Sequence, residues 1–212
     1  MVKAILFDFW GTLVEQGVQS PLRQVKYMLG LERMGFSKFV TMFESVFMTK
    51  KFENLDTAFK EVCKFFNTRY NFKLLNDLVG LWNKNWMLAK PYDDTMEGLE
   101  WLKDKGLKIG LISNTDSVSV ENVMNKFDLS SNFDTIVLSY QCGMLKSNPK
   151  MFDLAAEKLG VNKEDILMVG DSLISDIEAA KNAGVKAILM DRKDRRAVEE
   201  KLLNIFDLEK FL

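Results

Sequence analysis

Short runs of apolar residues alternate with helical patterns over most of this chain. The runs are four or five residues long, as is typical of strands buried on both faces of a sheet, and they cover residues 4–8, 109–113, 135–138, 166–169 and 187–190. Amphipathic patterns with helical spacing lie between or after the later runs, at residues 95–105, 118–127, 149–159 and 176–183. This alternation predicts an α/β fold, a doubly wound parallel sheet with helices on both faces.

The segment between residues 15 and 92 has a different pattern. It contains no convincing strand but four amphipathic helical patterns, with predicted starts at Ser20-Pro21, Ser37 and Asp56 and an end before Pro91. A stripe of phenylalanines predicts that these helices share a small core, and it consists of Phe36, Phe39, Phe43, Phe47, Phe59 and Phe66. We therefore expect an all-α four-helix cap (residues 15–92) inserted into a core formed by residues 1–14 and 93–212, with hinges near residues 14–17 and 89–93.

The composition excludes several classes of protein and of chemistry. The net charge of −1 gives no electrostatic case for a nucleic-acid or membrane partner, and no apolar run approaches the roughly 20 residues of a membrane span. Two cysteines fit a reducing cytoplasm, where we expect the protein, as a monomer. The chain has no histidine, so it can form neither a Ser-His or Cys-His nucleophile pair nor a histidine-ligated zinc site.

The charge is distributed unevenly between the two parts. Residues 15–92 hold 12 Lys/Arg and 7 Asp/Glu, a net charge of +5 in a chain whose total is −1. A solvated helical surface would explain this excess, and so would a lid that closes over an anionic substrate.

Polar residues gather at the ends of four predicted strands. Ligands of an open parallel sheet bind at the carboxyl ends of its strands, so these residues are the candidates for chemistry. Asp8 ends the first run, Ser113-Asn114 the second and Gly170-Asp171 the fourth, while Lys146 follows the third. We expect these carboxylate, hydroxyl and ammonium groups to converge on one site.

In these positions the sequence resembles the haloacid dehalogenase superfamily of hydrolases, whose motifs it matches in order along the core. The matching residues are Asp8, Gly11 and Thr12 of the first motif, Ser113 and Asn114 of the second, Lys146 of the third, and Gly170, Asp171 and Asp176 of the fourth. The resemblance implies a Rossmann-like core, and the helical insertion after the first motif is similar to the family's cap. It also implies an Asp8 nucleophile that forms a covalent intermediate, which water then hydrolyses.

The resemblance further implies a Mg²⁺ ion held by Asp8, Asp171 and the backbone carbonyl of Trp10. Asp176 is either an outer-shell partner of the metal or the N-cap of the following helix. Lys146 would neutralise Asp8 and the transferring group. The alternatives are that Lys146 is only a surface lysine at a helix start, or that the nearby Lys150 takes this role. Phosphoryl oxygens would be held by Ser113, Asn114, Trp10, Gly11, Thr12 and Lys146, through hydroxyls, the ammonium and the amides of residues 9–11 and 114.

One position departs from the pattern. Phosphatases of this superfamily usually carry a second aspartate, a general acid, two residues after the nucleophile, where this chain has Trp10. General acid–base help is worth roughly 10²–10⁴-fold, so its loss matters. Glu15, near a hinge, is one possible replacement acid.

The L-2-haloacid dehalogenases carry an aromatic residue at this position and use no metal, but they typically lack the Gly-Asp that this chain keeps. Phosphonatases lack the second aspartate too, but rely on a cap lysine.

The acidic fourth motif favours phosphoryl chemistry, because Asp171 beside Asp8 calls for a metal ion or a raised pKa. We therefore expect a Mg²⁺-dependent phosphatase of a small phosphate ester. One alternative is an L-2-haloacid dehalogenase in which Arg23 or another cap cation binds the carboxylate of the substrate. The other is a non-catalytic protein that binds a phospho-ligand.

Overall fold

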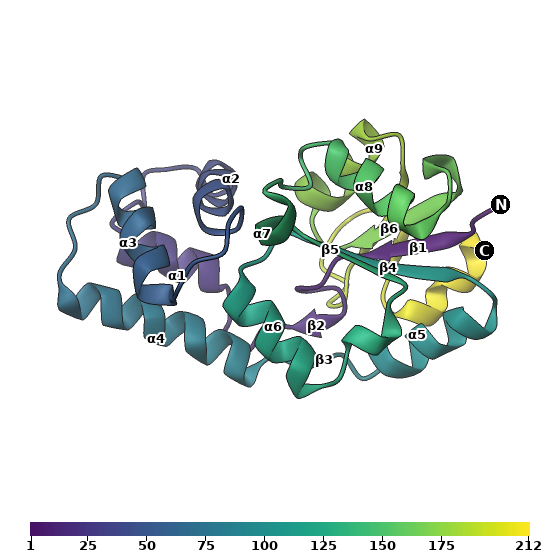
Figure 1. Cartoon of the computed structure of the whole chain (residues 1–212), viewed down its shortest axis with the longest axis horizontal. Helices are drawn as coiled ribbons and strands as arrows, with labels where there is room; N and C mark the ends of the chain where they lie inside the picture. Colours follow the sequence, from purple (N-terminus) through teal and green to yellow (C-terminus); the bar gives the residue numbers. More distant parts are fainter.

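The computed structural model describes residues 1–212, and its centre is a six-stranded parallel sheet (Figure 1). The strand order is β5-β4-β1-β6-β7-β8. The strands are β1 (Ala4–Phe7), β4 (Lys108–Ser113), β5 (Thr135–Leu138), β6 (Ile166–Gly170), β7 (Lys186–Met190) and β8 (Lys201–Leu202). The five predicted strands are confirmed, whereas β8 has only two residues and was missed because so short a run carries no pattern.

β1 lies in the middle of the sheet and is buried along its whole length. Ala4 pairs with Lys108 of β4 on one side and with Ile166 of β6 on the other. Because a strand between two neighbours that is covered on both faces never meets water, every position of β1 is apolar. The strand therefore holds the residue that follows it, Asp8, at the centre of the carboxyl edge.

Helices cover both faces of the sheet, as the alternation of patterns predicted. One face packs against α5 (Thr95–Asp104), α6 (Ser117–Lys126) and the carboxyl-terminal 3₁₀ helix η4 (Ile205–Phe211). The other face packs against α8 (Lys150–Leu159) and α9 (Ala179–Asn182). A single turn, α7 (Ser139–Cys142), follows β5. The predicted helices at 95–105, 118–127 and 149–159 agree with α5, α6 and α8 to within one residue at each end.

The fourth predicted helix, at 176–183, begins earlier than expected. A π-helical turn, η3 (Leu173–Glu178), comes first and runs directly into α9. Ser172 is the N-cap of this turn, and its hydroxyl accepts a hydrogen bond from the amide of Ser175. Asp176 is therefore inside the helical turn and is not its N-cap.

Four helices form a separate layer beside the sheet, on the left of Figure 1. They are α1 (Pro21–Met28), α2 (Phe36–Phe47), α3 (Leu55–Phe65) and α4 (Phe72–Leu88). They form an apolar cluster of 14 buried residues, which is separate from the two clusters that pack against the sheet. Four phenylalanines of the predicted stripe are fully buried in it, namely Phe39, Phe43, Phe47 and Phe59.

Two of the predicted helix starts in this layer were wrong. Helix α2 begins at Phe36 after Gly35, one residue before the expected Ser37. Helix α3 is capped by Asn54, whose side chain accepts from the amide of Thr57, so Asp56 lies inside the first turn. Either residue type can cap a helix, and the pattern could not decide between neighbouring candidates.

A two-stranded antiparallel pair joins the four helices to the sheet. It consists of β2 (Val14–Glu15) and β3 (Lys90–Pro91), so the chain leaves for α1 and returns from α4 side by side. The side chain of Asn85 accepts a hydrogen bond from the amide of Val18 and ties the outgoing segment to α4. In Figure 1 the labels β2 and β3 mark this pair between the four helices and the sheet.

Candidate active site

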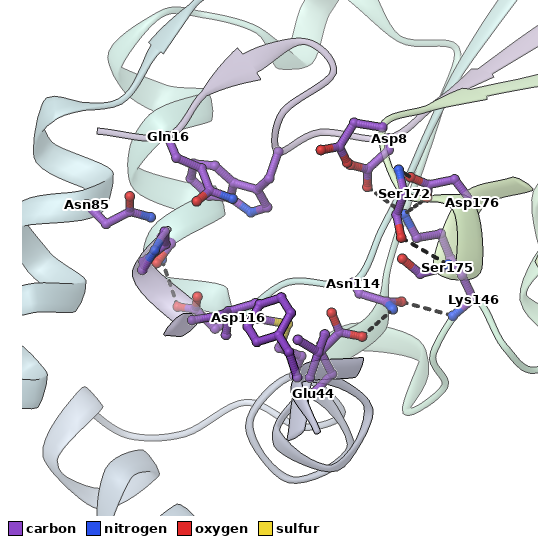
Figure 2. Close-up of a pocket in the computed structure, with 18 of the residues that line it drawn as sticks. Asp8, Gln16, Glu44, Asn85, Asn114, Asp116, Lys146, Ser172, Ser175 and Asp176 are labelled. Atoms are coloured by element: carbon purple, nitrogen blue, oxygen red, sulfur yellow. Dashed lines mark hydrogen bonds and ion pairs between the residues drawn. The ribbon is translucent and has the colours of Figure 1, made fainter. Parts of the chain in front are cut away.

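A cavity of about 260 Å³ lies between the carboxyl ends of the strands and the helices α1, α2 and α4 (Figure 2). Asp8, Asn114, Lys146, Asp171 and Asp176 line its floor, and they follow the carboxyl ends of four strands, β1, β4, β5 and β6. The structure thus brings together the residues that the strand-end argument selected. Parallel strands end at one edge of a sheet, which is why residues more than 100 positions apart meet here.

Asp8 is buried, with 6% of its surface exposed, and only one of its carboxylate oxygens is engaged by the protein. Its Oδ1 accepts from the Lys146 ammonium at 2.5 Å and from the Ser113 hydroxyl at 3.0 Å. The backbone amide of Asp8 donates to the carbonyl of Val169 at 2.9 Å and holds the residue in line with the sheet. The second oxygen, Oδ2, accepts no hydrogen bond from the protein, so it is available for a ligand or for attack.

Lys146 lies in the loop before α8 and is 2% exposed, so the reading of a surface lysine is wrong. Its ammonium bridges Asp8 and Asp176, at 2.5 Å from an oxygen of each. Its backbone amide donates to the Asn114 side chain at 2.9 Å. Burial alone would lower the pKa of Lys146, but the carboxylates of Asp176 and Asp8 outweigh it, and the pKa is raised. The nearby Lys150 is exposed on α8.

Three carboxylates form a compact cluster in this site. One oxygen from each of Asp8, Asp171 and Asp176 lies within 4.8 Å of the others. Burial, together with the negative charges of Asp8 and Asp176, raises the pKa of Asp171 to about 8. Burial likewise raises the pKa of Asp176 to about 6, against the lowering effect of Lys146. Hard oxygen donors that repel one another in this way match the preferences of a divalent cation such as Mg²⁺.

The backbone around the cluster is shaped to fit these carboxylates. Gly11 has φ +79°, and a Cβ placed on it would lie 2.5 Å from Oδ2 of Asp171. A Cβ on Gly170 would lie 2.3 Å from Cγ of Asp176. The Trp10 carbonyl, the third predicted ligand, accepts no hydrogen bond from the protein. The residues present therefore fit a metal ion.

The predicted phosphate contacts divide into available and unavailable groups. The amides of Phe9, Trp10 and Asn114 donate to no acceptor of the protein. The amide of Gly11, however, donates to the carbonyl of Val14 at 2.8 Å, so it cannot also bind a phosphoryl oxygen. The Thr12 prediction was also wrong, because its side chain is fully buried outside the cavity and its carbonyl is held by Arg192. The hydroxyl of Ser113 is used to orient Asp8, not to line the cavity.

Trp10 lines the cavity, and its ring nitrogen donates to the Thr115 hydroxyl at 2.9 Å. Glu15 and Arg23, the other two residues that the sequence suggested for this site, lie elsewhere. Glu15 lines a different cavity and has a Lys193 ammonium 3.4 Å from its carboxylate. Arg23 is exposed, with its guanidinium over the ring of Phe36 at 4.0 Å, and it does not line the cavity that contains Asp8.

Two acidic residues of the cavity were missed as site residues by the sequence reasoning. Asp116 follows Ser113-Asn114 and caps α6, and its carboxylate also accepts from Trp82 of α4 at 2.9 Å. Glu44 projects from α2 into the cavity and accepts from the Asn114 side chain at 2.8 Å. A signal for Glu44 does exist. It is a lone acid in a row with a spacing of four, Phe36, Val40, Glu44 and Met48, whose other members are apolar and also line the cavity.

Comparison with known families identifies the class of protein. The model of the haloacid dehalogenase-like hydrolases matches residues 2–184, which include every residue discussed for this site except Arg192 and Lys193. The chain belongs to this family of hydrolases. The resemblance noted in the motifs is therefore confirmed, and so is the α/β fold class.

The similar proteins include both phosphatases and dehalogenases. The chain is 27% identical to a glyceraldehyde 3-phosphate phosphatase of Methanothermobacter thermautotrophicus, over 97% of this chain and 94% of the relative. It is 31% identical to a phosphoglycolate phosphatase of Aquifex aeolicus, over 89% and 84% of the two chains. An (S)-2-haloacid dehalogenase of Pseudomonas putida is 24% identical over 91% and 86%. Among solved structures, a phosphatase of the family from Thermococcus onnurineus superposes with a TM-score of 0.63 at 25% identity, over 99% and 97%.

Within the whole chain, no helix has the length and apolar character needed to span a lipid bilayer.

Proposed function

We propose that this hydrolase is a Mg²⁺-dependent phosphatase that acts on a small phosphorylated metabolite through an aspartyl-phosphate on Asp8. The carboxylate cluster of Asp8, Asp171 and Asp176 is the observation that supports this most strongly. A nucleophile surrounded by two further carboxylates repels any anionic substrate, so it is useful only together with a cation. The phosphatases among the relatives support the same choice.

In this proposal Asp8, Asp171 and the Trp10 carbonyl hold the metal. Asp176 is the third carboxylate of the cluster and acts as an outer-shell partner. When bound, Mg²⁺ supplies the positive charge that lets a phosphate approach three carboxylates. Lys146 adds a second, fixed charge, which its two ion pairs keep in place. Together these residues stabilise the charge of the transferring phosphoryl group.

The reacting atom of Asp8 is assigned to Oδ2. Its partner Oδ1 is held by Lys146 and Ser113, so the carboxylate cannot rotate freely, and Oδ2 keeps one orientation. The amides of Phe9, Trp10 and Asn114 donate to the phosphoryl oxygens. Oδ2 attacks phosphorus, the bond to the leaving oxygen breaks, and water later hydrolyses the acyl phosphate to phosphate and free Asp8.

We also propose that residues 15–92 act as a cap that opens and closes over residues 1–14 and 93–212. The short β2–β3 pair is the part of the molecule suited to such a hinge, because only two chain segments cross there. Helices α1, α2 and α4 contribute one wall of the cavity, so closure would surround a bound metabolite.

The dehalogenase alternative is less well supported by this cavity. Its substrate is a carboxylate, and the predicted partner Arg23 does not line the site. The non-catalytic alternative predicts the same ligands without turnover. A screen of phosphate esters with Mg²⁺ separates the three. We expect phosphate release that EDTA and Asp8→Asn both abolish. Halide release from L-2-chloropropionate in the presence of EDTA would favour the dehalogenase, and phosphate binding without turnover would favour the third reading.

A further inference from the structure

Hydrolysis of an alkyl phosphate needs a proton donor at the leaving oxygen, because an alkoxide is a poor leaving group. The chain has no histidine, and the Trp10 ring nitrogen gives its proton to a hydrogen bond with Thr115. Lys146 is also unsuitable, since its two carboxylate partners raise its pKa and hold its protons. The donor must then be one of the carboxyl groups that line the cavity.

Five carboxyl groups line the cavity, and four of them have other commitments. Asp8, Asp171 and Asp176 form the acidic cluster. Asp116 accepts at both oxygens, from the amide of Ser119 at 2.9 Å and from the ring nitrogen of Trp82 at 2.9 Å, and these bonds keep it as a helix cap. Glu44 alone remains.

Glu44 faces Asp8 across the cavity, with Asn114 and Lys146 along the side between them (Figure 2). Its Oε2 accepts from Nδ2 of Asn114 at 2.8 Å, and Oδ1 of the same Asn114 accepts from the backbone amide of Lys146 at 2.9 Å. This link fixes the carboxyl group relative to the nucleophile. Oε1 accepts no hydrogen bond from the protein, so it is free to carry a proton toward the cavity.

The surroundings of Glu44 allow both of its protonation states at neutral pH. Burial raises its pKa to about 7. The Asn114 side chain and the Lys146 ammonium lower the pKa, whereas the carboxylates of Asp8 and Asp176 raise it again. A carboxyl group with a pKa near the working pH can give up a proton and take one back with comparable ease.

We propose that Glu44 is the general acid and base of the reaction, a catalytic residue supplied by α2. This inference rests on the proposed phosphatase function. As Oδ2 of Asp8 bonds to phosphorus and the bond to the leaving oxygen breaks, Oε1 gives its proton to that oxygen, and the alcohol departs. Glu44, now a carboxylate, then accepts a proton from the water that attacks the aspartyl-phosphate. Phosphate leaves, Asp8 is a carboxylate again, and Glu44 is again protonated.

The test compares leaving groups at saturating Mg²⁺. For wild type and Glu44→Gln, kcat/KM is measured with p-nitrophenyl phosphate, phenyl phosphate and the best alkyl phosphate from the ester screen. Glutamine keeps the size of Glu44 and an acceptor for Asn114 but holds no acidic proton. We expect a loss of roughly 10²–10⁴-fold with the alkyl phosphate, and no more than a few-fold loss with p-nitrophenyl phosphate, whose nitrophenolate leaves without a proton.

Glu61→Gln is the matched control, because it removes the same charge from an exposed ion pair with Lys64 on α3. It should match wild type on every substrate. Glu44→Asp, which keeps the acidic proton on a shorter side chain, should recover part of the alkyl phosphate activity. In wild type, kcat/KM for the alkyl phosphate should fall as the pH rises through the pKa of Glu44 in the Mg²⁺-bound enzyme, because Glu44 then loses its proton, and this limb should be absent from Glu44→Gln.

An equal loss on all three substrates would overturn the proposal, because it would mean that Glu44 only binds substrate. Unchanged activity of Glu44→Gln with the alkyl phosphate would overturn it too. Wild type that hydrolyses no phosphate ester at all would instead refute the phosphatase function, and the acid role with it. The two failures are therefore distinguishable.

Discussion

Replacing Gly11 with alanine tests the shape of the proposed metal site while leaving every proposed ligand residue in the sequence. The new Cβ would lie 2.5 Å from Oδ2 of Asp171, whereas ordinary van der Waals contact begins at 3.4 Å, so the carboxylate must retreat by about 0.9 Å. Metal–ligand distances tolerate changes of only about 0.2 Å. Mg²⁺ is especially demanding, because it requires near-ideal octahedral geometry. The displacement is therefore large enough to remove Asp171 from the coordination of the ion.

The magnitude follows from two separate effects. Gly11 has φ +79°, and holding an L-residue in this left-handed region costs roughly 1–2 kcal/mol, equivalent to a fall in Tm of roughly 2–8 °C for a chain of this size. Disturbing even an outer-shell partner of a metal typically reduces affinity roughly 10–100-fold, so Mg²⁺ affinity should fall at least that much.

Gly30→Ala separates the two effects. Gly30 has φ +70°, but a Cβ placed on it meets nothing within 4 Å. We expect both variants to lose similar stability in urea unfolding, while only Gly11→Ala loses Mg²⁺ binding, measured by calorimetry and by the Mg²⁺ dependence of turnover. Wild-type Mg²⁺ affinity in Gly11→Ala would refute the assignment of Asp171 to the metal. Weakened Mg²⁺ binding in Gly30→Ala would show that backbone strain alone reduces the affinity, and not the displacement of Asp171.

Three further predictions concern the proposed nucleophile Asp8, its ion-pair partner Lys146 and the layer formed by α1–α4. Asp8→Asn should retain the wild-type Tm to within a few degrees but give no turnover and no hydroxylamine-sensitive phosphoprotein after a rapid acid quench, because the amide cannot attack phosphorus. Lys146→Met should lower the free energy of unfolding by roughly 3–5 kcal/mol in urea, since it leaves two buried carboxylates without their cation, and adding Asp176→Asn should restore part of this. Phe43→Ala should cost roughly 3–5 kcal/mol, whereas Phe72→Ala, at an 80% exposed position, should cost little. Equal losses for the two phenylalanine variants would contradict the assignment of a separate core to α1–α4.

The sequence alone was sufficient for the sheet and for the convergence of its strand ends. Apolar runs such as the one before Asp8 can hardly be anything but buried parallel strands, and parallel strands end at one edge. The positions of Asp8, Lys146 and Asp171 follow from that edge and from the motif spacing. Their meeting in one cavity is thus a consequence of topology, which local patterns specify well.

What the sequence could not provide is the direction in which each polar group points. The Gly11 amide donates to the carbonyl of Val14, the Ser113 hydroxyl donates to Asp8, and the Thr12 side chain is buried outside the cavity. Each of these outcomes depends on a backbone turn or a side-chain rotamer, and a motif records only residue types. The same applies to Asp176, whose carboxylate accepts from Lys146 and from the Ser172 amide. It lies in a π-helical turn that the spacing of the residues did not predict.

The contribution of α2 was hidden for a different reason. Glu44 reaches the cavity only because the four-helix layer packs over the strand ends, and this packing between layers is set by tertiary contacts. Trp82 of α4 bonds to Asp116, and Asn114 bonds to Glu44, so the helical layer and the sheet share polar contacts directly at the cavity. The missing acid at Trp10 was visible in the sequence, but the proposed replacement, Glu44, belongs to a segment whose position relative to Asp8 only the structure gives.

The proposed metal ion and the proposed proton on Glu44 would both reduce the same excess of negative charge in the cavity. Five carboxyl groups and two cations, Lys146 and Arg196, line the cavity, so with every group charged it would carry an excess of three negative charges. A divalent cation cancels two of these charges, and a proton on Glu44 cancels the third. A phosphate ester would then enter a cavity without net charge. A bound Mg²⁺ would favour the carboxylate form of Glu44, because opposite charges attract, and should therefore lower the pKa of Glu44. Protonated Glu44 would then release its proton to the leaving oxygen more easily.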